Sequence, residues 1–290
     1  MQMAAWLDLS SVAGSKSEVL SPWHDRHVGK KGRAAISRFR QALRDRLDLL
    51  VVAAGFLTIV PVPEGHSQNQ ASLGRAVAYF PVVGTLLGCF VAGLDAIYGH
   101  VLPRPVAGAI DIALFAALTG GMHLDGLMDS FDGLFGGRDR ERRLEIMRDS
   151  RVGSFGAISA VLVLLLEYAA LTDLAGQPRA ATLIVAPTIG RWSMALAVWA
   201  FPYARETGRG AAFKLDLGAY QIVQAGCWTL LVVSVMGYPG IRMLAGSALA
   251  ALVLGGWVRH RLGGLTGDTY GATCELVSAA TFVLCAAGGA

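Results

Sequence analysis

Long apolar blocks are the feature that most constrains the fold of this chain. Seven of them approach the length of about 20 residues that a helix needs to cross a hydrocarbon core roughly 30 Å thick. Only 16% of the 290 residues are charged, against roughly 25% in an ordinary soluble domain. The sequence therefore predicts an all-α, polytopic membrane helical bundle. The approximate bounds of the blocks are 77–98, 106–122, 152–171, 180–201, 221–237, 243–258 and 272–287.

An eighth apolar block, residues 49–60, is short and is followed by Pro61 and Pro63, which would break a helix. If this block crossed the bilayer, the basic N-terminus and the arginine-rich segment 138–151 would lie on opposite sides. With seven crossings, most Lys and Arg residues share one side, which the positive-inside rule makes cytoplasmic. We therefore expect about seven crossings in the inner membrane of the cell, plus one short interfacial or re-entrant N-terminal segment.

The chain divides by composition into two parts. Residues 1–46 are basic and polar and contain neither the apolar core nor the cleavage site of a secretory signal. We expect them to form a mobile extension whose last part is an amphipathic helix on a lipid surface. Residues 47–290 are expected to form an integral membrane domain, with a cytoplasmic active-site loop over residues 122–151.

Three aspartates interrupt the apolar pattern after the second block. Asp125, Asp129 and Asp132 follow an i, i+4, i+7 spacing, which places all three along one face of a helix. Carboxylates at the end of a membrane segment are unfavourable unless a cation binds them. Oxygen ligands that leave open positions suit Mg²⁺ or Mn²⁺. This acidic stripe therefore predicts a metal site, and the neighbouring His123 is a metal ligand, a proton carrier or a structural residue.

Arginines follow the acidic stripe. We take Arg138, Arg148 and Arg151 as candidate phosphate ligands, because a planar guanidinium binds phosphate oxygens through two hydrogen bonds. The three arginines between Arg138 and Arg148, taken singly, are more typical of a solvated surface. Arg205 adds another positive charge on the same predicted side. Carboxylates and arginines beside a membrane indicate phosphoryl chemistry on a diphosphate.

Polar residues also occur at and within the later apolar blocks. Thr266 and Asp268 lie at the start of the last predicted helix, where free N–H groups favour an anion. A helix cap by Asp268 or Thr269 explains this polar segment equally well. Arg191 and Glu167 lie inside predicted crossings, where a charged residue is usually paired or functional. Charges at this depth would suit a secondary transporter. Most polar groups, however, gather at one mouth of the predicted bundle, which favours an enzyme.

Four motifs occur in this order along the chain: FLTIVPVP at 56–63, YFPVVGTLLG at 79–88, GGMHLDGLMDSFDGLFGGRDRERRLEIMRDSRVGSFG at 120–156 and GGLTGDTYGATCEL at 263–276. Together they resemble the cobalamin synthase family of adenosylcobinamide-GDP ribazoletransferases, in which the motifs have the same order. The first motif has Ile59 where the family usually has an arginine or a similar cation, which argues against a phosphate role for that early loop.

The resemblance implies a membrane-embedded, Mg²⁺-dependent transferase of vitamin B12 biosynthesis. It would join adenosylcobinamide-GDP to α-ribazole, or to its 5′-phosphate, and release GMP. The expected partners are these two substrates and membrane lipid, with no nucleic acid and with a homo-oligomer as an open alternative. A rival enzyme is a phosphatidyltransferase that acts on a CDP-lipid.

The matched motifs, together with the charge pattern described above, give the expected site residues. The proton of the attacking hydroxyl would pass to Asp149 or to a metal-bound aspartate. The expected sets are Asp125, Asp129 and Asp132 for the metal, His123, Asp132 and Asp149 for catalysis, and Arg138, Arg148, Arg151, Arg191, Thr266 and Asp268 for the substrate and its phosphates.

Overall fold

The computed structural model describes residues 30–61, 70–174, 176–205 and 208–288, and these residues form helices and no strand. The chain divides into two compact units, Met1–Leu47 and Asp48–Ala290. Most of the extension expected over residues 1–46 lies outside the described residues. The helices are α1 (Lys30–Leu57), α2 (Gln70–Ala76), α3 (Phe80–Tyr98), α4 (Arg104–Leu118), α5 (Met122–Gly136), α6 (Arg140–Ile146), α7 (Ser154–Asp173), α8 (Gly176–Ala200), α9 (Arg209–Ala212), α10 (Ala219–Val233), α11 (Gly237–Leu262) and α12 (Gly267–Gly288), with short 3₁₀ turns η1 (Val77–Tyr79) and η2 (Ser234–Met236).

Helix α1 contains the short apolar block that we expected to lie in the interface or re-enter. The block forms the last turns of the helix, where Val52, Ala53 and Leu57 are buried. The helix ends at Leu57, four residues before Pro61. Earlier in α1, the exposed apolar side chains of residues 36, 39, 43 and 47 recur at the spacing of one helical face.

Five helical segments of the described chain are long and apolar enough to cross a membrane. A sixth candidate is the pair α4 and α5, which passes the same test together but is bent by 87°. The chain is therefore an all-α, polytopic membrane protein, as predicted. The five segments are Leu73–Tyr98, Ser154–Asp173, Pro178–Ala200, Ala219–Leu262 and Gly267–Gly288.

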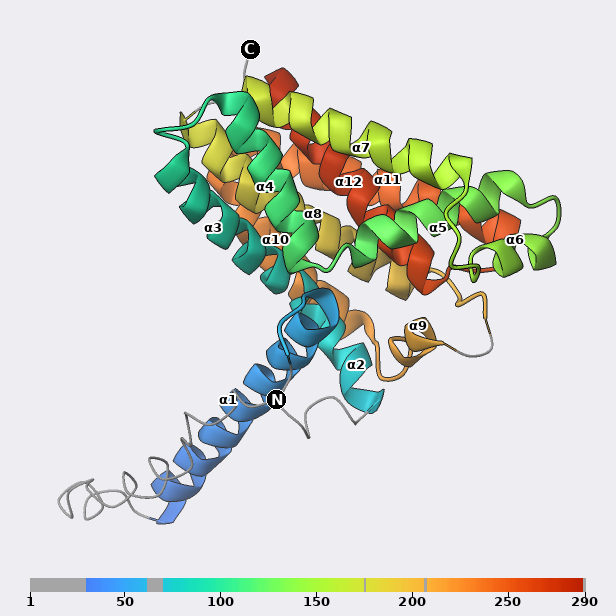
Figure 1. The fold of residues 1–290 in the computed structure, drawn as a ribbon. Coiled ribbons are helices and arrows are strands. Elements are labelled where there is room, and N and C mark those ends of the chain that lie inside the picture. The colour runs from blue at the N-terminus through green and yellow to red at the C-terminus, as the bar shows by residue number, and fades with distance from the viewer. Residues whose placement is uncertain (1–29, 62–69, 175, 206–207, 289–290) are drawn as a thin grey trace, which may run out of the picture. The chain divides into compact units, whose positions relative to one another are not determined.

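The expected seven blocks map onto these segments with two differences. The 44-residue segment Ala219–Leu262 contains two of the blocks, and at 1.5 Å per residue it would reach about 66 Å, roughly twice the hydrocarbon thickness. The block expected at 106–122 is not one continuous crossing. It breaks after Leu118, because Gly120 and Gly121 adopt positive φ angles of 62° and 68° and turn the chain sharply into α5 (Figure 1).

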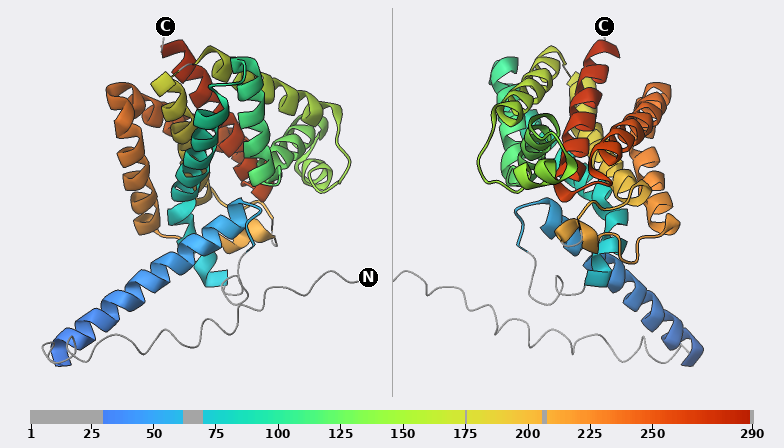
Figure 2. Two further views of the ribbon diagram at one scale, coloured as in Figure 1. Left: turned by 60° about the vertical axis from the view of Figure 1, so that its left-hand side comes forward. Right: turned by 90° about the vertical axis from the view of Figure 1, so that its right-hand side faces the viewer.

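Helix α8 lies at the centre of the bundle and packs against α3, α10, α11 and α12 (Figure 1). Glycines allow the closest of these approaches. A Cβ atom on Gly84 or Gly88 of α3 would lie only 2.3 or 2.5 Å from a backbone oxygen of α8. In both views of Figure 2, α12 runs along the bundle and its C-terminal end lies away from α9.

A buried ion cluster ties three helices together at that far end of the bundle. Arg179 of α8 lies 3.0 Å from Asp95 of α3 and donates a short hydrogen bond to Asp111 of α4. Tyr98 also donates to Asp111, which is fully buried. The cluster pairs charges that would be costly to bury singly.

Candidate functional site

Helix α5 carries the acidic stripe, and it meets the start of α12 through direct backbone contact. A Cβ atom on Gly126 would lie only 2.8 Å from the carbonyl oxygen of Asp268, so no other residue fits there without moving a helix. This approach brings Asp268 to the stripe. Asp129 interacts electrostatically with both Asp125 and Asp268. We call Asp125, Asp129 and Asp268 the acidic cluster.

Asp268 is oriented by two neighbours. Arg205, in the loop after α8, donates from Nη2 to Asp268 Oδ2 at 3.0 Å, and Thr266 Oγ1 donates to the same oxygen at 3.2 Å. Arg205 is also within electrostatic range of Asp129. From the sequence, this arginine was only one of several cations on the expected cytoplasmic side. The structure makes it the cation that faces the acidic cluster.

Thr266 has a structural task as well. Its backbone N–H donates to Thr269 Oγ1 at 2.8 Å, and its own Oγ1 accepts from the Thr269 backbone N–H at 3.2 Å. This reciprocal pair is a capping box at the start of α12. Thr266 is fully buried. Its hydroxyl is therefore positioned to orient Asp268, while its expected phosphate contact stays a prediction.

Asp132, the third residue of the stripe, is turned toward α7. Its carboxylate accepts hydrogen bonds from the backbone N–H groups of Gly153 at 2.7 Å and Gly156 at 2.8 Å. A Cβ atom on either glycine would lie 2.4 Å from an oxygen of Asp132. The carboxylate thus caps the N-terminus of α7, where free N–H groups and the helix dipole favour a negative charge. Its expected roles as metal ligand and catalytic residue stay predictions.

The loop between α5 and α7 is fixed to the bundle by specific contacts. Met147 is buried in the space beside Gly133, where a Cβ atom would lie 2.3 Å from the Met147 Cγ. Arg140 donates from Nε to the carbonyl of Leu262 and from Nη2 to that of Ala204, both at 2.8 Å. We expected Arg140, taken singly, on a solvated surface. In the structure it links the last residue of α11 to the loop after α8.

Asp149 forms an ion pair with Arg151, with Nη2 and Oδ2 2.6 Å apart. Hydrogen bonding from the Arg151 side chain lowers the pKa of Asp149 to about 2. A carboxylate with such a low pKa is a weak proton acceptor near neutral pH. Arg138, Arg148 and Arg151 all have exposed side chains, which leaves them accessible to a phosphate.

Arg191 lies apart from these arginines, buried in α8. Its Nη2 is 3.4 Å from Nδ1 of His123, and it is within electrostatic range of Glu167 and Glu275. Arg191, Glu167 and Glu275 line one small cavity inside the bundle. We call His123, Glu167, Arg191 and Glu275 the buried polar cluster, and the expected substrate role of Arg191 stays a prediction.

His123 and Glu275 of this cluster, together with the neighbouring Cys274, form a group that could hold a metal ion. Single ligand atoms of His123, Cys274 and Glu275 lie within 4.8 Å of one another. The guanidinium of Arg191 stands beside them and opposes the binding of a further cation. The acidic cluster does not meet this distance criterion, but it offers only oxygen ligands, which is the ligand type that Mg²⁺ prefers. The metal site expected on the acidic stripe therefore stays a prediction.

Comparisons with known proteins cover nearly all of the second unit. A family model described as cobalamin-5-phosphate synthase matches residues 49–286. No solved structure matches the chain.

Three curated relatives carry the name adenosylcobinamide-GDP ribazoletransferase. The protein of Desulforamulus reducens is 40% identical over 79% of this chain and 92% of its own length, and that of a Roseiflexus species is 40% identical over 81% and 88%. An Escherichia coli protein is 36% identical over 76% of this chain and 92% of its own length. The chain therefore belongs to the cobalamin-5-phosphate synthase family.

Proposed function

We propose that this protein is a transferase of cobalamin biosynthesis that joins adenosylcobinamide-GDP to α-ribazole, or to its 5′-phosphate, and releases GMP. The names of its relatives supply the substrates. The observation that supports the chemistry is the contact of α5 with α12 at Gly126, which gathers three carboxylates with Arg205 beside them. The names favour neither a CDP-lipid transferase nor a transporter.

The acidic cluster fits Mg²⁺ as its cofactor. Its donors are carboxylate oxygens from two rigid helices, which is the ligand type that Mg²⁺ prefers. Asp125 is exposed and Asp129 is half-buried, so a bound ion would keep positions open for substrate oxygens. When bound, Mg²⁺ would neutralise the negative charge that develops on the departing phosphate. Asp125, Asp129 and Asp268 would hold it.

The protein's own side chains perform the remaining tasks. Arg205 and the exposed Arg138, Arg148 and Arg151 bind phosphate oxygens and hold the diphosphate for in-line attack. The ribazole hydroxyl oxygen forms a bond to the cobinamide-side phosphorus while the bond from that phosphorus to the GMP oxygen breaks. The hydroxyl proton passes to a carboxylate of the acidic cluster, because Arg151 keeps Asp149 a weak base.

We place this site at the cytoplasmic face of the inner membrane. The loops that carry Arg140, Arg205 and Leu265 are joined by hydrogen bonds at one end of the bundle. These loops belong to the set that holds most of the Lys and Arg residues. By the positive-inside rule, that set faces the cytoplasm.

The test is GMP release by the purified protein in detergent, incubated with adenosylcobinamide-GDP, α-ribazole and Mg²⁺. We expect GMP and the cobalamin product in equal amounts, and loss of both when EDTA removes the metal. Asp125→Asn should abolish transfer while the protein stays folded. Absence of GMP would contradict the proposed reaction, and full activity in EDTA would contradict the metal.

A further inference from the structure

A cavity of about 190 Å³ opens beside the acidic cluster. Asp125 and Asp268 form part of its wall, so a group that fills the cavity lies next to the acidic cluster. The other walls are largely aromatic and aliphatic, with Met194 and Val198 of α8 among them. The acidic cluster and the arginines bind charged groups, so they do not explain why an apolar cavity lies beside them.

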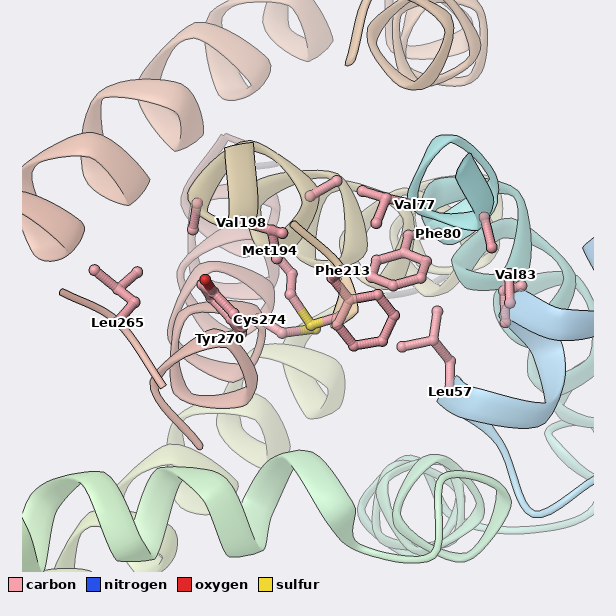
Figure 3. Packing of buried hydrophobic residues seen from close by; sticks show 14 of the residues in the cluster. Leu57, Val77, Phe80, Val83, Met194, Val198, Phe213, Leu265, Tyr270 and Cys274 are labelled. Carbon is pink, nitrogen blue, oxygen red and sulfur yellow. The ribbon is translucent and has the colours of Figure 1, made fainter. Parts of the chain in front are cut away.

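Three phenylalanines give the cavity rigid walls. Phe56 and Phe213 meet edge to face with ring centroids 4.5 Å apart, and Phe80 meets Phe213 in the same way at 5.6 Å. They come from three separate elements, namely α1, α3 and the segment after α9. Figure 3 shows Phe80, Phe213 and Met194 close together in this region. Aromatic faces and a methionine thioether are the surfaces on which a flat aromatic ring packs well.

Two polar atoms in this region lack partners. His123 and Tyr270 both line the cavity and are each only 2% exposed. His123 Nε2 and Tyr270 Oη make no hydrogen bond to any of the described residues. The other ring nitrogen of His123 faces Arg191 and Glu275, at 3.4 and 3.8 Å, which fixes the ring. Because buried polar atoms normally have partners, a ligand with one or two polar atoms would complete this site.

The size and polarity of the cavity indicate which part of the two proposed substrates it can bind. An engineered apolar cavity of about 150 Å³ holds one benzene ring, so this cavity admits a ring system slightly larger than benzene and excludes a corrin. Guanine carries polar atoms around most of its edge, and phenylalanine and methionine walls would leave them unpaired at a cost.

We propose that this cavity binds the flat, weakly polar base of the nucleoside acceptor, with its sugar directed toward the acidic cluster, and that its walls limit the size of that base. The inference rests on the proposed transfer to a ribazole. It makes Met194 and Val198 specificity-determining residues. His123 becomes a substrate contact, which the Arg191 and Glu275 side chains hold in position.

The test compares Val198→Phe, which fills the cavity, with Val161→Phe, the same change at an exposed position of α7. We expect Val198→Phe to raise the KM for α-ribazole by at least about tenfold, since pockets discriminate single methylene groups by roughly 10 to 200-fold. The KM for adenosylcobinamide-GDP should not change, and Val161→Phe should change neither. An unchanged KM for α-ribazole, or an equal rise for both substrates, would overturn the proposal.

Met194→Ala tests the opposite direction and does not depend on how well the filled variant folds. The assay uses ribosides of benzimidazole and of the larger naphthimidazole. We expect the variant to shift kcat/KM toward the larger base by roughly tenfold relative to the unmodified protein. An unchanged ratio would overturn the proposed base site. If the unmodified protein released no GMP with any nucleoside, the proposed reaction would fail instead, so the two failures are distinguishable.

Discussion

Substitution of Asp132 tests whether this aspartate has a structural task that differs from the metal-binding task proposed for Asp125 and Asp129. Its side chain is 8% exposed and accepts hydrogen bonds from two backbone N–H groups at the start of α7. Asp132→Asn preserves the shape of the side chain, but the NH₂ group that replaces one oxygen would face a backbone N–H. Two donors would then point at each other, and neither could accept a hydrogen bond. We therefore expect the substitution to loosen the junction between α5 and α7.

The magnitude follows from these two contacts. A hydrogen bond to a charged group contributes about 1.5–3 kcal/mol, and a negative charge at a helix N-terminus contributes about 0.3–2 kcal/mol. The substitution removes one of the two hydrogen bonds, and the remaining bond goes to a neutral oxygen in place of a charged one. The free energy of unfolding should therefore fall by about 2–4 kcal/mol. For a domain of this size that corresponds to a decrease in Tm of roughly 5–15 °C.

Thermal unfolding of the purified protein in detergent, followed by tryptophan fluorescence, measures this decrease. The matched control is Asp125→Asn, the same change on the same helix at an exposed position. It should leave the Tm within about 2 °C of the unmodified protein, as surface substitutions usually do, and still abolish transfer. If Asp132→Asn instead kept the original Tm and lost all activity, Asp132 would be a metal ligand and the capping argument would be refuted.

Three further predictions concern other contacts. Gly126→Ala should lower kcat by roughly a hundredfold, because the added Cβ atom would push Asp268 away from α5. The matched control is Gly246→Ala, where the Cβ atom meets no other atom within 4 Å, and it should leave kcat unchanged. Arg179→Met should leave the buried Asp111 and the partly buried Asp95 without their cation and lower the free energy of unfolding by about 3–5 kcal/mol. Because this ion cluster lies apart from the proposed site, both KM values should stay unchanged, and a change in either would contradict that separation. The pKa of Asp149 is lowered to about 2, so its ion pair with Arg151 is fully formed above about pH 4 and is lost only as the pH falls toward 2. The pH–activity profile of Asp149→Asn should therefore keep the acidic limb of the unmodified protein. If the acidic limb disappeared in this variant, Asp149 would be the general base after all.

The fold was largely predictable because hydrocarbon thickness sets the length of an apolar helix. The block at 106–122 is the informative exception. Its composition continues past Leu118, so a count of apolar residues finds no end there. The break depends on the positive φ angles of Gly120 and Gly121. Two adjacent glycines do not by themselves predict a break, because Gly255 and Gly256 lie inside the continuous helix α11.

The acidic stripe was predictable only within its own helix. The spacing of Asp125, Asp129 and Asp132 places them on one face, but that face contacts two neighbouring helices. Asp132 lies about 10 Å along the axis from Asp125 and meets the start of α7. Asp268 joins the cluster from the start of α12 through a backbone contact. Periodicity along one helix contains no information about which other helix supplies the missing carboxylate.

Glycines next to the aspartates explain how the acidic cluster keeps its geometry. Gly126 lets the backbone of α12 reach α5, Gly153 and Gly156 let the Asp132 carboxylate reach α7, and Gly133 makes room for Met147 of the connecting loop. At Gly126 and Gly133 a Cβ atom would also meet the backbone oxygens of Asp268 and Arg143, so these two approaches do not depend on a side-chain rotamer. Close helix contacts thus hold the acidic residues in place without a substrate, and this would preorganise the site for the proposed phosphoryl transfer.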